Sequence, residues 1–135
     1  MKVVLDTNVL VSGLLTRHGN CARILELVVD GALTMCLDGR IRREYTRVCH
    51  EPRLGLDVSE VDEFLRFCTH YAESITAHPL AATLPDASDL PFLEVAVSTG
   101  AVLVTGNLKH FPRRAIGAAS VITPAELLTL LQTKA

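Results

Sequence analysis

A carboxylate follows the first hydrophobic segment of the chain without a gap. Val3, Val4 and Leu5 form a short apolar run, typical of a strand buried on both faces of a parallel sheet, and Asp6 comes directly after them. Open α/β folds bind their ligands at the carboxyl ends of such strands. Because a charge in that place is costly unless a positive group compensates it, we interpret Asp6 as a ligand of a divalent metal ion.

Further oxygen-bearing side chains could converge on the same edge. Glu44 lies at helical spacing on the sheet-facing edge of a helix predicted over residues 39–50. Asp89 projects into the apolar stripe of a later helix, and Asn107 follows a late buried strand. Asp86 also precedes that later helix, and either aspartate could instead serve only as its cap. Clustered acids raise one another's pKa unless a cation is bound, and ligation by oxygen alone suits Mg²⁺ or Mn²⁺.

Basic residues accompany these acids, although the formal net charge of the chain is −2. Arg40, Arg43 and Arg47 form a helical stripe beside that of Glu44, and Lys109 belongs to a second basic group later in the chain. We regard these four as candidates for holding phosphates, which would make binding sensitive to salt. A solvated helix face would explain any one of them equally well, and an i, i+4 ion pair between Arg40 and Glu44 is the simpler alternative for that acid.

Strands and helices alternate along the chain. The predicted strands comprise residues 3–5, 33–37, 74–76, 101–105 and 120–122, and the predicted helices residues 7–15, 22–29, 39–50, 59–71, 89–99 and a last one from residue 124. The expected capping residues are Asn20, Asp38, Ser59 with Asp62, and Thr123 with Glu126. A β-α-β order implies a parallel sheet with right-handed crossovers.

The length of the chain predicts one domain spanning residues 1–135, because 135 residues suffice for a single hydrophobic core. No apolar run approaches the roughly 18 residues that a membrane span needs. The chain enters a strand at once, with no leader pattern, so we expect a cytoplasmic protein. The four cysteines are irregularly spaced, which predicts buried free thiols and not zinc ligands. The histidines show no spacing typical of metal ligands.

Four sequence features, in order and spacing, resemble the PIN domain family. They are L-D-T-N-V-L at residues 5–10, an acid on the helix after the second strand, D-x-x-D at residues 86–89, and V-T-G-N at residues 104–107. The longer forms D-x-x-D-x-x-F-L and N-L-K-H-F-P resemble the subgroup of VapC-like toxins from toxin–antitoxin systems. The resemblance covers nearly the whole chain.

This resemblance implies a three-layer α/β/α sandwich with a central parallel sheet and a metal-dependent ribonuclease that hydrolyses RNA phosphodiester bonds. Asp6 would be the first metal ligand, Glu44 the second acid, and Asp89 or Asp86 the third, with the stripe position favouring Asp89. Asn107 stands where many relatives carry a fourth aspartate, so a second metal site would be weaker or absent. Thr105 would support the site, and three residues after the first strand would lie around it or on the substrate side: Thr7, Asn8 and Ser12.

Partners and alternatives follow from the same resemblance. An antitoxin protein would cover the site, and a homodimer is a further expectation because many PIN domains dimerise. The alternative function is a non-catalytic PIN module that binds RNA or a protein, motivated by Asn107. A phosphatase of the haloacid-dehalogenase type, with Asp6 as nucleophile, is a weaker reading, because that chemistry expects an aspartate where Asn8 stands.

Overall fold

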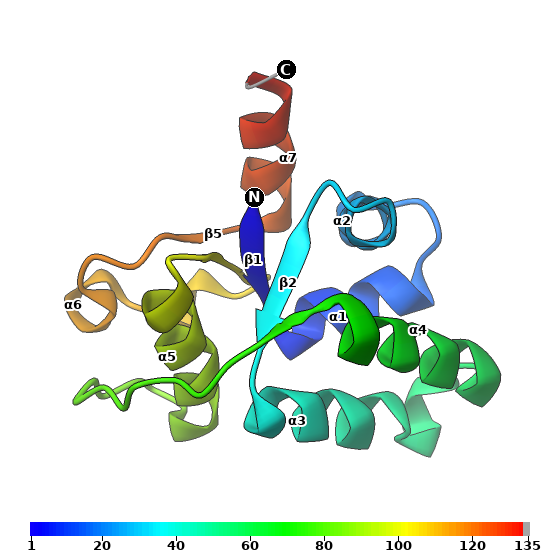
Figure 1. The fold of residues 1–135 in the computed structure, drawn as a ribbon, viewed down its shortest axis with the longest axis horizontal. Coiled ribbons are helices and arrows are strands. Elements are labelled where there is room, and N and C mark those ends of the chain that lie inside the picture. The colour runs from blue at the N-terminus through cyan, green and yellow to red at the C-terminus, as the bar shows by residue number, and fades with distance from the viewer. Residues whose placement is uncertain (134–135) are drawn as a thin grey trace.

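Five parallel strands form the central sheet of this computed structural model, which describes residues 1–133 (Figure 1). The strand order is β3-β2-β1-β4-β5, so the first strand occupies the centre. The strands are β1 (Lys2–Leu5), β2 (Thr34–Leu37), β3 (Glu73–Ser74), β4 (Val102–Val104) and β5 (Val121–Ile122). Leu5 pairs with Val104, which brings the residues after β1 and β4 side by side. The prediction of a parallel sheet is confirmed.

Helices cover the sheet to give the expected three-layer α/β/α sandwich. The α-helices are α1 (Thr7–Leu15), α2 (Asn20–Val29), α3 (Gly39–Cys49), α4 (Val58–Tyr71), α5 (Leu90–Thr99), α6 (Arg113–Ile116) and α7 (Pro124–Thr133). Three short 3₁₀ turns are η1 (Pro52–Leu54), η2 (Ala87–Asp89) and η3 (Leu108–His110). Figure 1 shows the carboxyl ends of β1 and β2 at the same end of the sheet as the first turns of α3 and α5.

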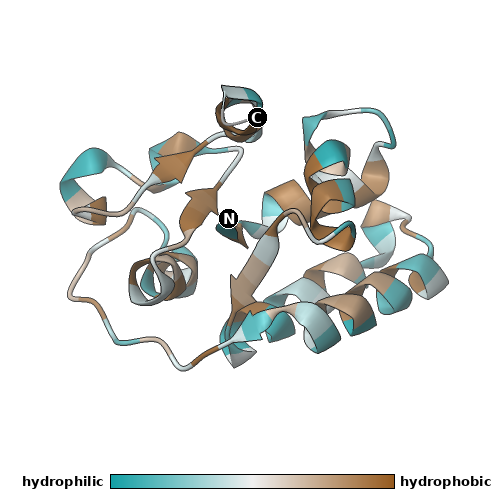
Figure 2. Cartoon of the chain, turned by 45° about the horizontal axis from the view of Figure 1, so that its top comes forward, coloured by the Kyte–Doolittle hydropathy of each residue, from teal (hydrophilic) through white to brown (hydrophobic). Residues whose placement is uncertain are grey.

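The core is built on the two central strands. Val3, Val4, Leu5, Leu103 and Val104 are fully buried, as expected of strands covered on both faces. Apart from the short β3, which is hydrophilic, the strands are mainly hydrophobic, whereas the helices alternate hydrophobic and hydrophilic residues (Figure 2). Burial of apolar side chains on each strand face therefore fixes the direction in which Asp6 and Thr105 emerge.

Most predicted helix boundaries agree with the structure, and two caps were wrong. Asp38 caps α3 by accepting a hydrogen bond from the amide of Ile41 at 3.0 Å. Thr123 and Glu126 form the reciprocal capping box of α7. The cap of α4 is Asp57, which accepts from the amide of Glu60 at 3.1 Å, and not Ser59 with Asp62. Asp62 instead contacts His50, the residue after α3, at 2.7 Å.

The second wrong cap lies at α2, where Gly19 occupies the N-cap position and Asn20 is already helical. The segment after β4 also holds a short helix, α6, that the sequence pattern did not indicate. Gly100 ends α5 with a φ of 73°, as expected of a glycine at that position.

The cysteines are free thiols, and Cys36, Cys49 and Cys68 are buried as predicted, whereas Cys21 is half-buried. Burial raises the pKa of Cys68 to about 12 and the pKa values of Cys36 and Cys49 to about 11, so these side chains stay protonated. None of the helices in residues 1–133 has the length and apolar character needed to cross a membrane.

A buried hydrogen bond joins α3 to the end of β1, since the hydroxyl of Tyr45 donates to the carbonyl of Leu5. We expect Tyr45→Phe to lower the free energy of unfolding by about 1–3 kcal/mol, because it leaves a buried carbonyl without its partner. Urea denaturation measures the loss. Tyr71 is 65% exposed, so Tyr71→Phe is the matched control and should change stability by less than about 0.5 kcal/mol. Equal stabilities of Tyr45→Phe and the wild type would contradict this account.

Candidate metal centre

Asp6 lies at the carboxyl end of β1, where its side chain is fixed by the neighbouring strand. Only 4% of the residue is exposed. The hydroxyl of Thr105 donates to Asp6 Oδ2 at 2.7 Å and accepts from the amide of Asn107 at 3.0 Å. Burial raises the pKa of Asp6, and the nearby charge of Glu44 raises it further, while the hydrogen bond from Thr105 opposes both. Asp6 is therefore a buried carboxylate whose ionised form is disfavoured by its surroundings.

Asp89 approaches the same point from the last residue of η2, just before α5. The residue is 8% exposed. Burial raises the pKa of Asp89 to about 6, and the negative charge of Asp6 adds to this effect. Asp89 Oδ2 lies 2.8 Å from Nδ1 of His110. The two atoms are not aligned as a hydrogen bond, and this buried oxygen has no other hydrogen-bond partner within residues 1–133.

Glu44 lies on α3 and is the third of these acids. Asp6, Asp89 and Glu44 together are called the acidic group. Its carboxylate accepts a hydrogen bond from the hydroxyl of Thr7, the residue after Asp6. Oε1 lies 3.9 Å from a guanidinium nitrogen of Arg47, whose side chain is 67% exposed. The alternative for Glu44, an ion pair with Arg40, does not form, because Arg40 turns toward other carboxylates. Glu44 thus remains on the side of α3 that faces the end of β1.

The structure distinguishes the environments of the two aspartates that the sequence left open. Asp86 is exposed and caps η2, with its carboxylate accepting from the amide of Ser88 at 2.9 Å and from its hydroxyl at 2.7 Å. These hydrogen bonds lower the pKa of Asp86. Asp89, by contrast, is buried beside Asp6. Burial therefore favours Asp89 over Asp86 as the third acid.

Residues expected around the site occupy varied positions. Asn8 is exposed, and its Oδ1 accepts from the amide of Gly106 at 3.2 Å, which ties α1 to the loop after β4. Ser12 lies one turn further along α1 and is exposed. Arg43 and Lys109 are also exposed. Their positions leave these side chains accessible to a ligand.

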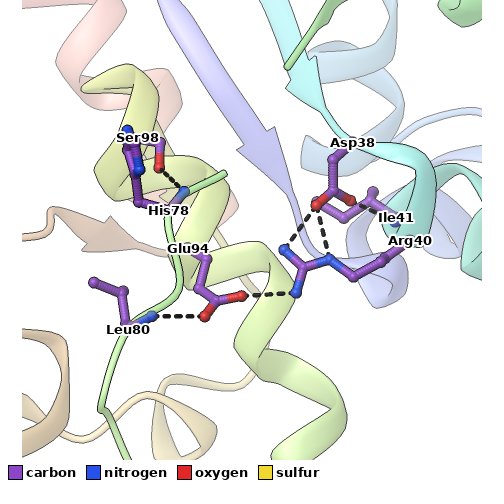
Figure 3. A network of polar contacts seen from close by, with 7 residues as sticks. All are labelled: Asp38, Arg40, Ile41, His78, Leu80, Glu94 and Ser98. Carbon is purple, nitrogen blue, oxygen red and sulfur yellow. Dashed lines mark hydrogen bonds and ion pairs between the residues drawn. The ribbon is translucent and has the colours of Figure 1, made fainter. Parts of the chain in front are cut away.

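Arg40 belongs to a polar network that the sequence did not reveal (Figure 3). Its guanidinium contacts Asp38 Oδ2 at 2.7 Å and Glu94 Oε1 at 2.7 Å. Glu94 Oε2 in turn accepts from the amide of Leu80 at 2.7 Å. Glu94 is 4% exposed in an otherwise apolar stretch of α5, and an acid in such a stretch is a signal that it needs a cationic partner. The contact of His110 with Asp89 was missed as well.

The donor set fits a hard divalent cation. Asp6, Glu44 and Asp89 offer only oxygen, which Mg²⁺ and Mn²⁺ prefer. Asp89 Oδ2 is buried, and its contact with His110 leaves the pKa of Asp89 raised to about 6, so a further positive ligand would relieve an existing cost. Across residues 1–133, no three His, Cys, Asp or Glu side chains are already close enough to hold a metal ion. The acids would therefore have to adjust their side chains to share one.

Comparison with known proteins identifies the family. The PIN domain family model matches residues 2–109, and the chain belongs to the PIN domain family. Uncharacterized protein MJ1680 of Methanocaldococcus jannaschii is 27% identical over 110 residues, which cover 79% of this chain and 71% of that protein.

A solved structure shares the fold. It is the crystal structure of VapBC2 from Rickettsia felis bound to a DNA fragment from their promoter. The match has a TM-score of 0.59 at 18% identity and covers 91% of this chain and 98% of the matched chain. At this level of identity the likeness extends to the fold alone.

Proposed function

We propose that this protein is a Mg²⁺- or Mn²⁺-dependent endoribonuclease. The observation that carries the proposal is the pair of buried carboxylates, Asp6 and Asp89, which come from separate elements and both have a pKa raised chiefly by burial, with the charge of Asp6 raising the pKa of Asp89 further. Carboxylates in this state are typical of functional sites, because structural stability alone would not favour them. Membership of the PIN domain family also supports the proposal of a nuclease.

Each residue of the site has a definite part in this proposal. Asp6, Asp89 and Glu44 are the residues that would hold the cation. When bound, such an ion lowers the pKa of a water molecule and stabilises the charge that develops on the phosphate. Thr105 fixes the orientation of Asp6, and the hydroxyl of Thr7 fixes that of Glu44.

Exposed basic residues supply the contact with RNA in the proposed mechanism. Lys109 and Arg43 hold phosphates on either side of the bond that breaks, and Arg47 adds positive charge beside Glu44. Hydrolysis by an in-line water leaves one product with a phosphate and the other with a free 3′ hydroxyl. Binding through such phosphate contacts weakens as salt is added.

We further propose that the nuclease is the toxin of a toxin–antitoxin pair. The shared fold with VapBC2 and the family membership support this assignment. An antitoxin would then cover the acidic group, and a homodimer would be compatible with that arrangement. Co-purification of the chain with the product of a small adjacent reading frame tests the partner. A chain that purifies without any such product would count against the toxin role.

The alternative function is a PIN module that binds RNA or protein without cleaving it. Asn107 favours this alternative, because an amide brings no negative charge to the position and the acids are not drawn together at metal-binding distance. Titration with Mn²⁺ discriminates between the two functions. Binding at or below millimolar concentration supports the nuclease, and no measurable binding at that level supports the module.

Thr105→Val should weaken Mn²⁺ binding by about tenfold or more, because groups that orient a metal ligand commonly contribute that much. Valine keeps the shape of the side chain but cannot donate to Asp6. Isothermal titration calorimetry with Mn²⁺ measures the change. Thr105→Ser retains the hydroxyl and serves as the control, with an affinity close to that of the wild type. A valine variant that binds as tightly as the serine variant would disprove the role of Thr105.

A further inference from the structure

A pocket of about 410 Å³ adjoins the acidic group on the side of α3 and α5. Its walls come from the start of α3, the segment of residues 75–79 and the start of α5. Arg43 and Leu90 line it and are the chain neighbours of Glu44 and Asp89. Consecutive Cα atoms lie about 3.8 Å apart, so the pocket begins one residue away from two of the acids.

Arg40 forms part of the pocket and is held rigidly there (Figure 3). Nε and Nη2 contact Asp38 Oδ2 at 2.8 and 2.7 Å, and Nη1 contacts Glu94 Oε1 at 2.7 Å. All three guanidinium nitrogens are therefore engaged by carboxylates, yet 42% of the side chain is exposed. These contacts use the edge of the guanidinium group, and none of them uses its flat face. A fixed guanidinium plane is a platform on which a nucleobase stacks.

Arg43 differs from Arg40 in its contacts. It is exposed, and its side chain makes no hydrogen bond or ion pair in the part of the chain that the structure describes, residues 1–133. Its charge is consequently available for a phosphate. Asp38 and Glu94 both pair with Arg40 and not with Arg43, so a ligand with a neutral ring and one adjoining anionic group would place that anionic group at Arg43.

The remaining walls suit the ring of a nucleobase. Ile75, Pro79 and Leu90 provide apolar surface, while Thr76 is exposed and offers a hydroxyl. The volume is in the usual range for small-molecule sites and exceeds what one planar base requires. Aromatic side chains are absent from the described lining, so the stacking surface has to come from Arg40.

We propose that this pocket binds one unpaired nucleotide of the RNA substrate, with its base stacked on Arg40 and its phosphate held by Arg43. The assignment rests on the proposed ribonuclease function and adds a recognition site to it. Because a base inside a duplex cannot enter the pocket, the protein selects single-stranded RNA. From the pocket, the RNA strand then continues to Glu44 and Asp89, whose chain neighbours line the pocket.

Filling the pocket tests the proposal without disturbing the polar network. Thr76→Trp places a bulky ring at an exposed position of the lining, and Thr69→Trp, at an exposed position of α4, is the matched control. Affinity for a fluorescein-labelled single-stranded oligoribonucleotide is measured by anisotropy in EDTA, so that no cleavage occurs. We expect Thr76→Trp to bind about tenfold more weakly than Thr69→Trp, as loss of one stacked base predicts. Equal affinities of the two variants would overturn the assignment.

The two arginines should respond differently to salt. Arg43→Gln removes a phosphate contact, so the slope of log K against log salt concentration, which is negative, should decrease in magnitude by about 0.7. Arg40→Lys keeps the charge but removes the flat face, so affinity should fall by about tenfold while the slope stays the same. The same slope change in both variants would overturn the division of roles between Arg40 and Arg43.

A separate measurement tests the proposed nuclease function independently of the pocket. Mn²⁺-dependent hydrolysis of bis(4-nitrophenyl) phosphate by the wild-type protein needs the acids but no base-binding pocket. If the wild-type protein hydrolyses this compound and the two tryptophan variants bind RNA equally well, the nuclease proposal is supported and the nucleotide site is ruled out. Absence of hydrolysis together with weaker RNA binding by Thr76→Trp would remove the nuclease and support the nucleotide site.

Discussion

Asp6→Asn should lower the rate of Mn²⁺-dependent RNA cleavage by about 10²–10³-fold. Asparagine retains the size of the side chain and an oxygen that accepts the hydrogen bond from Thr105, so the fold should persist. What the variant loses is the negative charge on a residue that is 4% exposed at the end of β1. Cleavage of an end-labelled RNA measures the effect, and circular dichroism checks that the variant is folded.

The control for Asp6→Asn is a second aspartate outside the acidic group. Asp57 is exposed and caps α4, and asparagine is a good N-cap, so Asp57→Asn should retain the wild-type cleavage rate. If Asp6→Asn also cleaved at the wild-type rate, Asp6 would have no part in the chemistry. The ribonuclease proposal would then lose its first ligand.

Asp89→Asn should abolish cleavage and at the same time stabilise the metal-free protein at neutral pH. The pKa of Asp89 is raised to about 6, chiefly by burial and then by the charge of Asp6. Keeping this carboxylate ionised at pH 7 therefore costs the folded state free energy that a neutral asparagine does not cost. Opposite effects on activity and stability are expected of a residue retained for function.

The raised pKa of Asp89 determines how the stability of the wild-type protein changes with pH. Between the ordinary pKa of 3.8 and the raised value of about 6, the folded protein retains a proton on Asp89 that the unfolded chain releases. Wild-type stability therefore falls as pH rises through this window. The advantage of Asp89→Asn over the wild type should grow by about 2–3 kcal/mol from pH 4 to pH 7. Urea denaturation in EDTA at several pH values measures it.

Asp86→Asn is the matched control for the stability experiment. Hydrogen bonds from Ser88 lower the pKa of Asp86, so its ionised form contributes stability that is present above its ordinary pKa and is lost as pH falls. Asp86→Asn should accordingly bring no gain in stability at neutral pH. A difference between Asp89→Asn and the wild type that did not change with pH would show that Asp89 is not under electrostatic strain.

The sequence predicted the positions that depend on strand order. Asp6 and Thr105 each follow a hydrophobic run, and the parallel register of Leu5 with Val104 places them in contact. The apolar stripe of α5 likewise indicated that Asp89 would be buried, and it is 8% exposed. Periodicity was sufficient in these cases because the backbone of a strand or helix alone sets the direction of the side chain.

Contacts between separate helices could not be predicted in the same way. Arg40 of α3 meets Glu94 of α5 across 54 positions in the sequence, and the pairing depends on how the two helices cross. The local alternative, an ion pair with Glu44, was equally consistent with helical spacing. The contact between His110 and Asp89 depends on the path of η3 after β4, for which the sequence indicated only a turn.

Anomalous diffraction from crystals soaked in Mn²⁺ would show whether Asp6 and Asp89 hold a metal ion. We expect a manganese peak at the carboxyl end of β1, within about 2.3 Å of oxygen atoms from both residues. No peak at these residues after a soak at millimolar Mn²⁺, or a peak held by other side chains, would contradict this expectation.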